Sequence, residues 1–180
     1  INSQLEDPVL MNYTVHAIKA LVVSTALQSQ FGEDALFCKL LVALLRRYQV
    51  DHDVLLQKLC SLVASIAYRN HVACELLADA EACEILATSL NNHHDNADLT
   101  IACLGAINNV AETLPNRRCF GNLGVCGVVI KYLKNFSKNV TLVVHLCRLM
   151  GTLALDDADN RSCLHDVNIY EVSVAVLREH

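Results

Sequence analysis

The feature that most constrains the fold is an internal repeat. Four nine-residue segments align without gaps, at 18–26 (IKALVVSTA), 59–67 (LCSLVASIA), 103–111 (CLGAINNVA) and 146–154 (LCRLMGTLA). The alanine that closes each segment recurs at steps of 41, 44 and 43 residues. Periods of this length are typical of solenoids, in which each unit buries its apolar face against the next unit. The sequence therefore predicts a stack of similar units.

The repeated segments have the apolar spacing of helices. Leu99, Cys103, Ile107 and Val110 fall on one stripe, which indicates one buried face per helix. With two Pro and six Gly in 180 residues, the chain lacks the turn residues of an all-β fold. The longest apolar run ends at Arg46, well short of the roughly 20 apolar residues a bilayer requires. We expect an all-α protein with no membrane span.

Composition and charge exclude further classes. The chain is 53% hydrophobic and 18% charged, which is opposite to the composition of disordered proteins. Its formal net charge of −5 gives no general electrostatic reason to bind nucleic acid or anionic lipid. We therefore expect neither nucleic acid nor a membrane among its partners.

The nine cysteines follow the repeat. Cys38, Cys83 and Cys126 share one column, at steps of 45 and 43 residues, and Tyr170 takes that column in the last unit. A residue type that recurs once per unit is a packing position, where reduced Cys behaves as a small hydrophobe. The odd number and wide spacing argue against a disulfide framework and for a reducing compartment. We expect the cytoplasm, with the nucleus as the alternative.

A second motif follows each long helix. It reads Asn70-His71, Asn116-Arg117 and Asn160-Arg161, and each Asn is predicted to cap the N-terminus of a short helix. Gly124 and Asn168 then match in position, and both residue types tolerate the left-handed conformation that ends a helix. Medium-length helices are expected next, at 37–45, 82–90, 125–133 and 169–177.

The unit is thus a short, a medium and a long helix, about 43 residues in all. We expect a single domain, 1–180, with the long helix of a first unit in 1–28 and complete units at 29–69, 70–113 and 114–157. Segment 158–180 forms an incomplete last unit. Because a long helix should follow it, and because the chain begins with Ile, we expect a piece of a longer protein.

This unit resembles the armadillo repeat. The resemblance rests on Asn116–Phe120 as the opening, Gly124–Leu133 as the second helix and Ile107–Ala111 in the third. HEAT repeats, with two helices per unit, are the near alternative. The resemblance implies a right-handed α-solenoid superhelix of about four repeats. It also implies a non-enzymatic scaffold that binds a partner protein or peptide in a concave groove lined by the long third helices.

The resemblance also places residues in that groove. The column where the family carries a peptide-binding Asn holds Ser24, Ser65, Asn109 and Thr152. The column of its Trp holds Ala20, Ser61, Gly105 and Arg148, and one turn earlier lie His16, Gln57, Ile101 and Val144. Without Trp and without an acidic column, recognition of basic nuclear-import signals is disfavoured, and Arg148 is a candidate anion contact. The candidate groove residues are Gln57, Ser61, Ser65, Gly105, Asn109, Arg148 and Thr152.

Two alternatives remain open at this point. Ser24, Ser65 and Thr152 could merely bond back to the preceding helical turn. The chain could also be a regulatory or assembly domain that docks, or forms a homodimer, through its uncovered C-terminal repeat. There Ile169, Val172, Val176 and Leu177 would make an exposed apolar patch.

No catalytic or cofactor site is predicted. The most metal-like string is the loop Asn91–Asn96, which a polar connection between helices explains equally well. Glycine-rich nucleotide-binding motifs are absent from the sequence. We therefore expect no enzyme activity, no cofactor and no metal.

Overall fold

A computed structural model describes residues 7–166 and 168–179. Within these residues every element of regular secondary structure is a helix. The helices are α1 Pro8–Leu21, α2 Thr25–Gly32, α3 Ala35–Arg47, α4 Asp53–Ala67, α5 His71–Asp79, α6 Ala82–Asn92, α7 Ala97–Val110, α8 Leu114–Asn122, α9 Val125–Asn135, α10 Val140–Ala154, α11 Ala158–Asp166 and α12 Ile169–Glu179.

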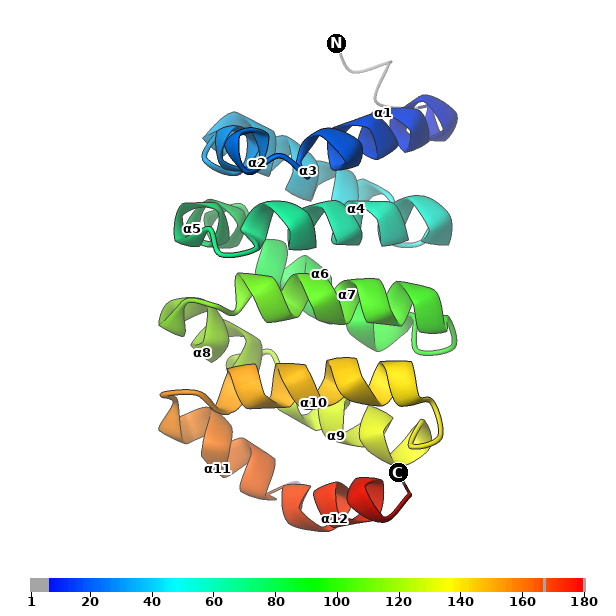
Figure 1. Ribbon diagram of the computed structural model, residues 1–180, viewed down its shortest axis with the longest axis vertical. Coiled ribbons are helices and arrows are strands. Elements are labelled where there is room, and N and C mark those ends of the chain that lie inside the picture. The colour runs from blue at the N-terminus through cyan, green and yellow to red at the C-terminus, as the bar shows by residue number, and fades with distance from the viewer. Residues whose placement is uncertain (1–6, 167, 180) are drawn as a thin grey trace.

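The helices stack as a solenoid. The long helices α1, α4, α7 and α10 lie side by side down one face, with the shorter helices beside and behind them (Figure 1). The order short, medium, long recurs three times and ends with α11 and α12. This is the all-α solenoid that the repeat predicted. In the part of the chain described, no helix is long and apolar enough to cross a membrane.

Short polar side chains start many of these helices. Asp7 and Asp34 accept hydrogen bonds from the first free amides of α1 and α3, and Asn96 and Asn139 do the same for α7 and α10. Asn70 caps α5 through the amide of Ala73, as the sequence predicted. These caps fix where each helix begins and so keep the repeat in register.

The core runs continuously through the stack, and the cysteine column lies within it. Cys38, Cys83 and Cys126 are fully buried, which confirms them as packing positions. All nine cysteines are free thiols. Ala67 and Ala111, from the alanine column, are also fully buried. Small side chains at these places let neighbouring helices approach closely.

The corner before each medium helix has a left-handed residue in the last three units. Gly124 has φ 78° and Asn168 has φ 63°, as predicted from their matched positions. Glu81 takes the same place before α6 with φ 70°. Glu81 could not be predicted at this position, because Glu rarely adopts the left-handed conformation.

The first unit departs from the sequence alignment. α1 ends at Leu21 and α2 begins at Thr25, so the segment 18–26 is not the end of one long helix. Ser24 is the N-cap of α2, which removes it from the groove column. The turn contains no Gly or Pro, and its Val22 is buried, so the apolar pattern continues through it and conceals the break.

Two of the three expected asparagine caps are also wrong. Thr113 is the N-cap of α8, which puts Asn116 inside the helix. The Asn116 side chain instead donates to the carbonyl oxygens of Cys74, at 3.0 Å, and Val110, at 2.9 Å. It therefore joins α8 to α5 of the preceding repeat and to the end of α7.

Asn160 makes the equivalent bridge one repeat later. Its amide donates to the carbonyl oxygens of Arg117 and Leu153, both at 3.0 Å. The Asp157 carboxylate accepts from the backbone N–H of Asn160 at the start of α11. In sequence, a capping Asn and a bridging Asn look alike, because both stand near a helix start.

The C-terminal patch is smaller than expected. Val172 is buried, and Ile169 and Val176 are partly buried, because α12 packs back against α9 and α11. Leu177 remains 79% exposed, and Tyr170 on the same helix is 76% exposed. The expectation that all four apolar residues are exposed is therefore wrong for Val172.

Candidate functional site

The face formed by the long helices carries the predicted groove residues. Arg148 is exposed on α10, and the other six are half-buried on α4, α7 and α10, namely Gln57, Ser61, Ser65, Gly105, Asn109 and Thr152. They come from the three complete repeats and lie on the long helices that run side by side on the face presented in Figure 1. The hydrogen bonds they already make decide what each can offer a ligand.

The hydroxyl groups are engaged within the protein. Ser65 Oγ donates to the carbonyl oxygen of Ser61 at 2.9 Å, one turn earlier on α4. Thr152 Oγ1 lies 3.2 Å from the carbonyl oxygen of Arg148 and 2.8 Å from Asn108 Oδ1 on α7. Bonding back to the helix therefore holds for both residues, and Thr152 also links two repeats.

Asn109, the one residue of its column that matches the family pattern, uses only part of its hydrogen-bonding capacity within the protein. Its Nδ2 donates to the carbonyl oxygen of Ala64 on α4 at 2.8 Å. Its Oδ1 accepts from Asn108 Nδ2 at 3.2 Å. An amide oxygen has two lone pairs, so Asn109 Oδ1 keeps acceptor capacity for a ligand N–H.

Gly105 leaves space in the column where the family carries Trp. A Cβ atom built there would have no neighbouring atom within 4 Å. The middle of α7 is therefore open on this face. A bulky side chain at this position would project into the space above the helix.

Two adjoining hollows lie at the C-terminal ends of the long helices. One, of about 440 Å³, is lined by Val22, Gln28, Ser65 and others. The second, of about 310 Å³, is lined by polar and charged side chains that include Asn108 and Thr152. Tyr68 and Asn109 line both, so the two hollows adjoin across the ends of α4 and α7.

Sequence reasoning missed three charged residues of the second hollow. Arg69, Glu112 and Arg117 line it together with Arg148. None of the three lies on a long helix, and they come from connections and a short helix. A search of the groove columns of the long helices therefore could not find them. The sequence pattern placed Asn116-Arg117 at the start of a short helix, and this interpretation gave Arg117 no role in binding.

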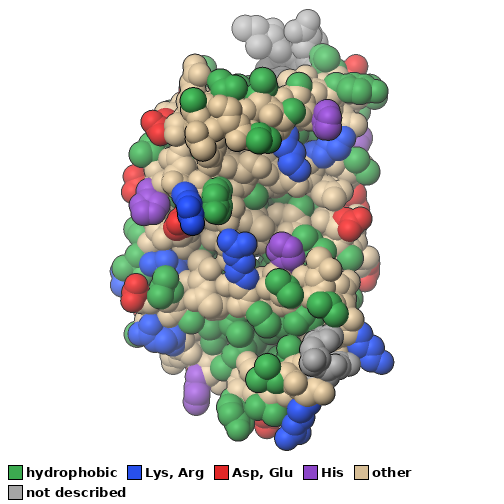
Figure 2. Space-filling view, in the orientation of Figure 1, with side chains coloured by type: hydrophobic (Ala, Val, Ile, Leu, Met, Phe, Trp, Pro, Cys, Tyr) green, Lys and Arg blue, Asp and Glu red, His purple; other side chains and the backbone are tan. Residues whose placement is uncertain are grey.

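The long-helix face is basic at its centre. Within their bounds the four long helices carry Lys19, Lys58 and Arg148, whereas their acids are Asp53 and Asp98, both in first turns. Figure 2 shows blue and purple side chains over the middle of this face and red ones mainly toward its edges.

The pKa of His145 on α10 is affected by this environment. Burial, and then the neighbouring Arg148 charge, lower the pKa of His145. Its imidazole is therefore neutral at pH 7 and adds no charge to the face.

The loop that looked metal-like has a structural role. His93 Nδ1 lies 3.3 Å from Asp53 Oδ1, and Asn96 Nδ2 donates to the other Asp53 oxygen at 2.9 Å. The other ring nitrogen of His93, Nε2, lies 2.7 Å from the carbonyl oxygen of Gln49. These contacts tie the loop to the preceding repeat. Across residues 7–166 and 168–179, no three His, Cys, Asp or Glu side chains are grouped to hold a metal ion.

Comparison with known proteins gives structural relatives alone. No protein-family model matches the chain, and no curated protein sequence matches it. Solved structures, in contrast, match over nearly the whole chain. A designed armadillo repeat protein in complex with the peptide (KR)4 has a TM-score of 0.82 at 17% identity, covering 98% of this chain and 71% of that one.

Two crystal structures of engineered proteins from a structural genomics consortium match equally well. One has a TM-score of 0.82 at 16% identity, with 94% of this chain and 66% of that chain covered. The other has a TM-score of 0.81 at 19% identity, with 94% and 68% covered. The chain thus spans about two thirds of the length of the structures it resembles. At these identities the likeness establishes the fold: the chain is an armadillo-type repeat solenoid.

Proposed function

We propose that this protein is a non-enzymatic scaffold that binds a partner protein, as an extended peptide, along the face of the long helices. The observation that carries the proposal is the pair of adjoining hollows at the ends of α4 and α7. They join surface from successive repeats, which is the arrangement that lets solenoids bind extended segments. The designed armadillo protein with its bound (KR)4 peptide supports the same use of the fold.

The polar lining suits a peptide backbone. Asn109 Oδ1 retains acceptor capacity, and the Asn108 amide lies beside it. Backbone N–H and C=O groups of an extended peptide need such partners when they leave water. Open space above Gly105 gives the peptide room to continue along α7.

A blocking substitution tests this proposal. Peptides selected from a random display library should bind the wild type, and Gly105→Trp should abolish that binding by filling the open space. Gly127→Trp on α9 is the matched control, because a Cβ there also meets no atom within 4 Å but lies outside the long-helix face. Equal binding by the two variants would place the peptide elsewhere. Circular dichroism would show that both variants keep their helices.

The C-terminal end carries the second candidate function, homodimerisation or docking through the last repeat. Tyr170 and Leu177 are largely exposed on α12, and a hollow of about 280 Å³ lies between α9 and α12. Light scattering over a concentration series tests it. A dimer that Leu177→Asp dissociates supports this candidate, whereas a monomer at every concentration removes it.

A further inference from the structure

Three arginines from different parts of the chain meet in the second hollow. Arg69 follows α4, Arg117 is on α8 and Arg148 is on α10, and all three line the same space of about 310 Å³. They are 48 and 31 residues apart in sequence, so the stacking of three successive repeats is what brings them together.

Among the described residues these arginines have no carboxylate partner, unlike Arg46 and Arg118. Arg46 pairs with Glu81, and Arg118 pairs with Asp157 at 3.2 Å. Among the described residues, Arg69, Arg117 and Arg148 form no ion pair. The guanidinium of Arg69 instead lies 5.3 Å from the centre of the Tyr68 ring, a cation–π contact that leaves its N–H groups available.

Arg117 is the least solvated of the three. Its residue is 7% exposed, and its Nη1 donates to the backbone carbonyl of Glu112 at 3.1 Å. Its buried Nε has no hydrogen-bond partner among the described residues. A largely buried cation without a carboxylate partner costs free energy, and an anion bound beside it in the hollow reduces that cost. A guanidinium also offers the planar donor fork that suits carboxylate and phosphate groups.

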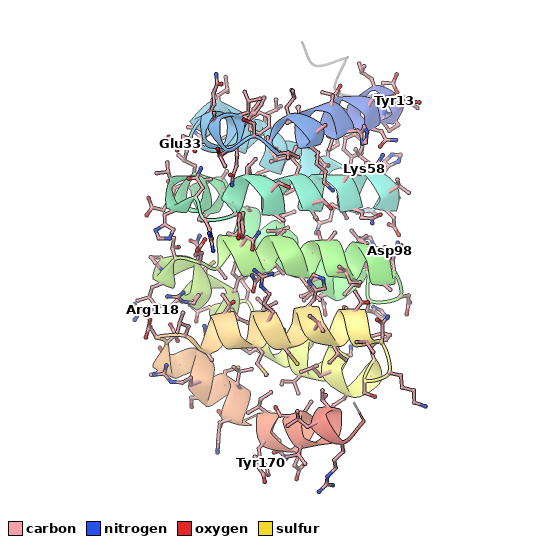
Figure 3. All side chains as sticks on the ribbon, in the orientation of Figure 1. Tyr13, Glu33, Lys58, Asp98, Arg118 and Tyr170 are labelled. Atoms are coloured by element: carbon pink, nitrogen blue, oxygen red, sulfur yellow. The ribbon has the colours of Figure 1, made fainter. Side chains whose placement is uncertain are left out.

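The surrounding charge has the same sign. Glu112 is the acid in the lining, so the three arginines leave a net charge of +2 in the hollow. Asp98 lies at the other edge of the face from Arg118, at the N-terminal end of α7 (Figure 3). Although the whole chain has a net charge of −5, this hollow therefore favours an anion over a cation.

We infer that this hollow is a subsite for an anionic side chain, carboxylate or phosphate, of the peptide bound along the long helices. The inference rests on the proposed function and specifies its partner as an acidic or phosphorylated segment. Arg117 provides a fixed, buried donor. Arg148 closes on the anion from the same repeat, 114–157, and Arg69 from the end of repeat 29–69. The negative charge of Glu112 lowers the affinity of the hollow for the anion.

Length-matched peptides test the charge preference. Fluorescein-labelled (Glu-Ala)4, (phosphoSer-Ala)4 and (Lys-Ala)4 would be titrated with the protein and followed by anisotropy. We expect both anionic peptides to bind at least about tenfold more tightly than the lysine peptide. If the glutamate peptide binds and the phosphoserine peptide does not, the hollow is sized for a carboxylate. The reverse result assigns it to phosphate. Equal affinity for all three peptides overturns the inference.

Substitutions in the hollow should move that preference in both directions. Arg148→Ala, or Arg69→Asn, which tolerates the left-handed backbone at that position, should weaken the anionic peptides about five- to tenfold. Glu112→Gln should tighten them by a few fold. Lys39→Ala, at an exposed position of α3, removes the same unit charge outside the hollow and should change little. If Lys39→Ala weakens binding as much as Arg148→Ala, only net charge matters and the inference fails.

Inorganic phosphate separates this inference from the proposed function. An NMR titration should shift the backbone amides around Tyr68, Glu112 and Arg117 in the wild type, and not in the Arg69→Asn, Arg148→Ala double variant. Phosphate shifts without peptide binding would keep the anion subsite and remove the peptide groove. Peptide binding blocked by Gly105→Trp but indifferent to charge would keep the groove and remove the subsite.

Discussion

Individual asparagines show how far residue type determines role. Asn70 caps α5 through its side-chain oxygen, as the sequence predicted, whereas Asn116 and Asn160 donate through their amide nitrogens to carbonyls of two other helices. In all three the Asn is followed three positions later by a small residue, Ala73, Cys119 or Cys163. The difference lies in which carbonyls the preceding repeat presents, and this depends on packing across about 40 residues of chain.

Two glycines predict opposite effects of the same substitution. Gly105→Ala should stabilise the protein by about 0.5–1 kcal/mol, because it adds helix propensity where no atom lies within 4 Å. Gly121→Ala should destabilise it by about 1–3 kcal/mol, since its Cβ would lie 1.8 Å from Asn160 Oδ1. Asn160 cannot swing aside without losing both of its bridging hydrogen bonds. Urea denaturation of both variants measures the two signs, and equal shifts would contradict the packing.

At the scale of elements, helix type and order were predictable and one boundary was not. Periodic apolar positions identify the helices of the complete repeats, because one face of each is buried in the stack. The break between α1 and α2 was missed, since Val22 at the turn is itself buried and continues the apolar pattern. The arginine hollow was missed because Arg69 and Arg117 lie outside the helices that line the groove, and only stacking brings them together.

The start of α11 predicts a dependence of stability on acid. Backbone hydrogen bonding from Asn160, and then the contact with Arg118, lower the pKa of Asp157 below 3.8. A carboxylate with a lowered folded-state pKa adds stability above its unfolded pKa and loses it as pH falls through the folded value. Asp157→Asn should therefore be less stable than the wild type at pH 7, with the gap closing toward about pH 2.

Thermal melts at pH 7, 4 and 2 measure this gap. Asp156→Asn is the control, because the neighbouring Asp156 is exposed and its positive φ suits Asn. A gap between wild type and Asp157→Asn that stays constant with pH would show that the charge of Asp157 does not stabilise the helix start.

At the scale of the whole molecule, the buried thiols predict a loss of stability in alkali. Burial raises the pKa of Cys38 to about 11 and those of Cys74 and Cys126 to about 12. The folded state thus favours the neutral thiol, while the unfolded chain ionises near its ordinary pKa of 9.0. Their stabilising effect is complete below about pH 8 and is lost as pH rises from about 9 to about 12.

Urea unfolding at pH 7.5, 9 and 10.5 tests this expectation. Cys74→Ala should have a shallower alkaline decline than the wild type, because it removes one buried ionisable group. Cys147 is only half-buried, so Cys147→Ala should change the decline less. Identical pH profiles for all three proteins would mean that the thiols do not contribute.

The stack also predicts where local opening occurs. α7 packs against a long helix on each side, α4 and α10, whereas α1 and α12 lie at the ends of the described stack. In a solenoid, stability comes from contacts between nearest neighbours. Hydrogen exchange followed by mass spectrometry should therefore show the slowest exchange in α4 and α7, and the fastest in α1 and α12. Slowest exchange at either end would contradict a stack of nearest-neighbour contacts.

Thiols meet across the boundaries between successive repeats. The sulfur atoms of Cys60 and Cys103 are 3.7 Å apart, and Cys83 lies near Cys119 as Cys126 lies near Cys163. Thiols with raised pKa values react slowly with oxidants while the stack is closed. Opening one of these three boundaries exposes its two thiols together, and a two-electron oxidant that reacts with both leaves a disulfide bond. An oxidised boundary is then a chemical record that the repeats once separated.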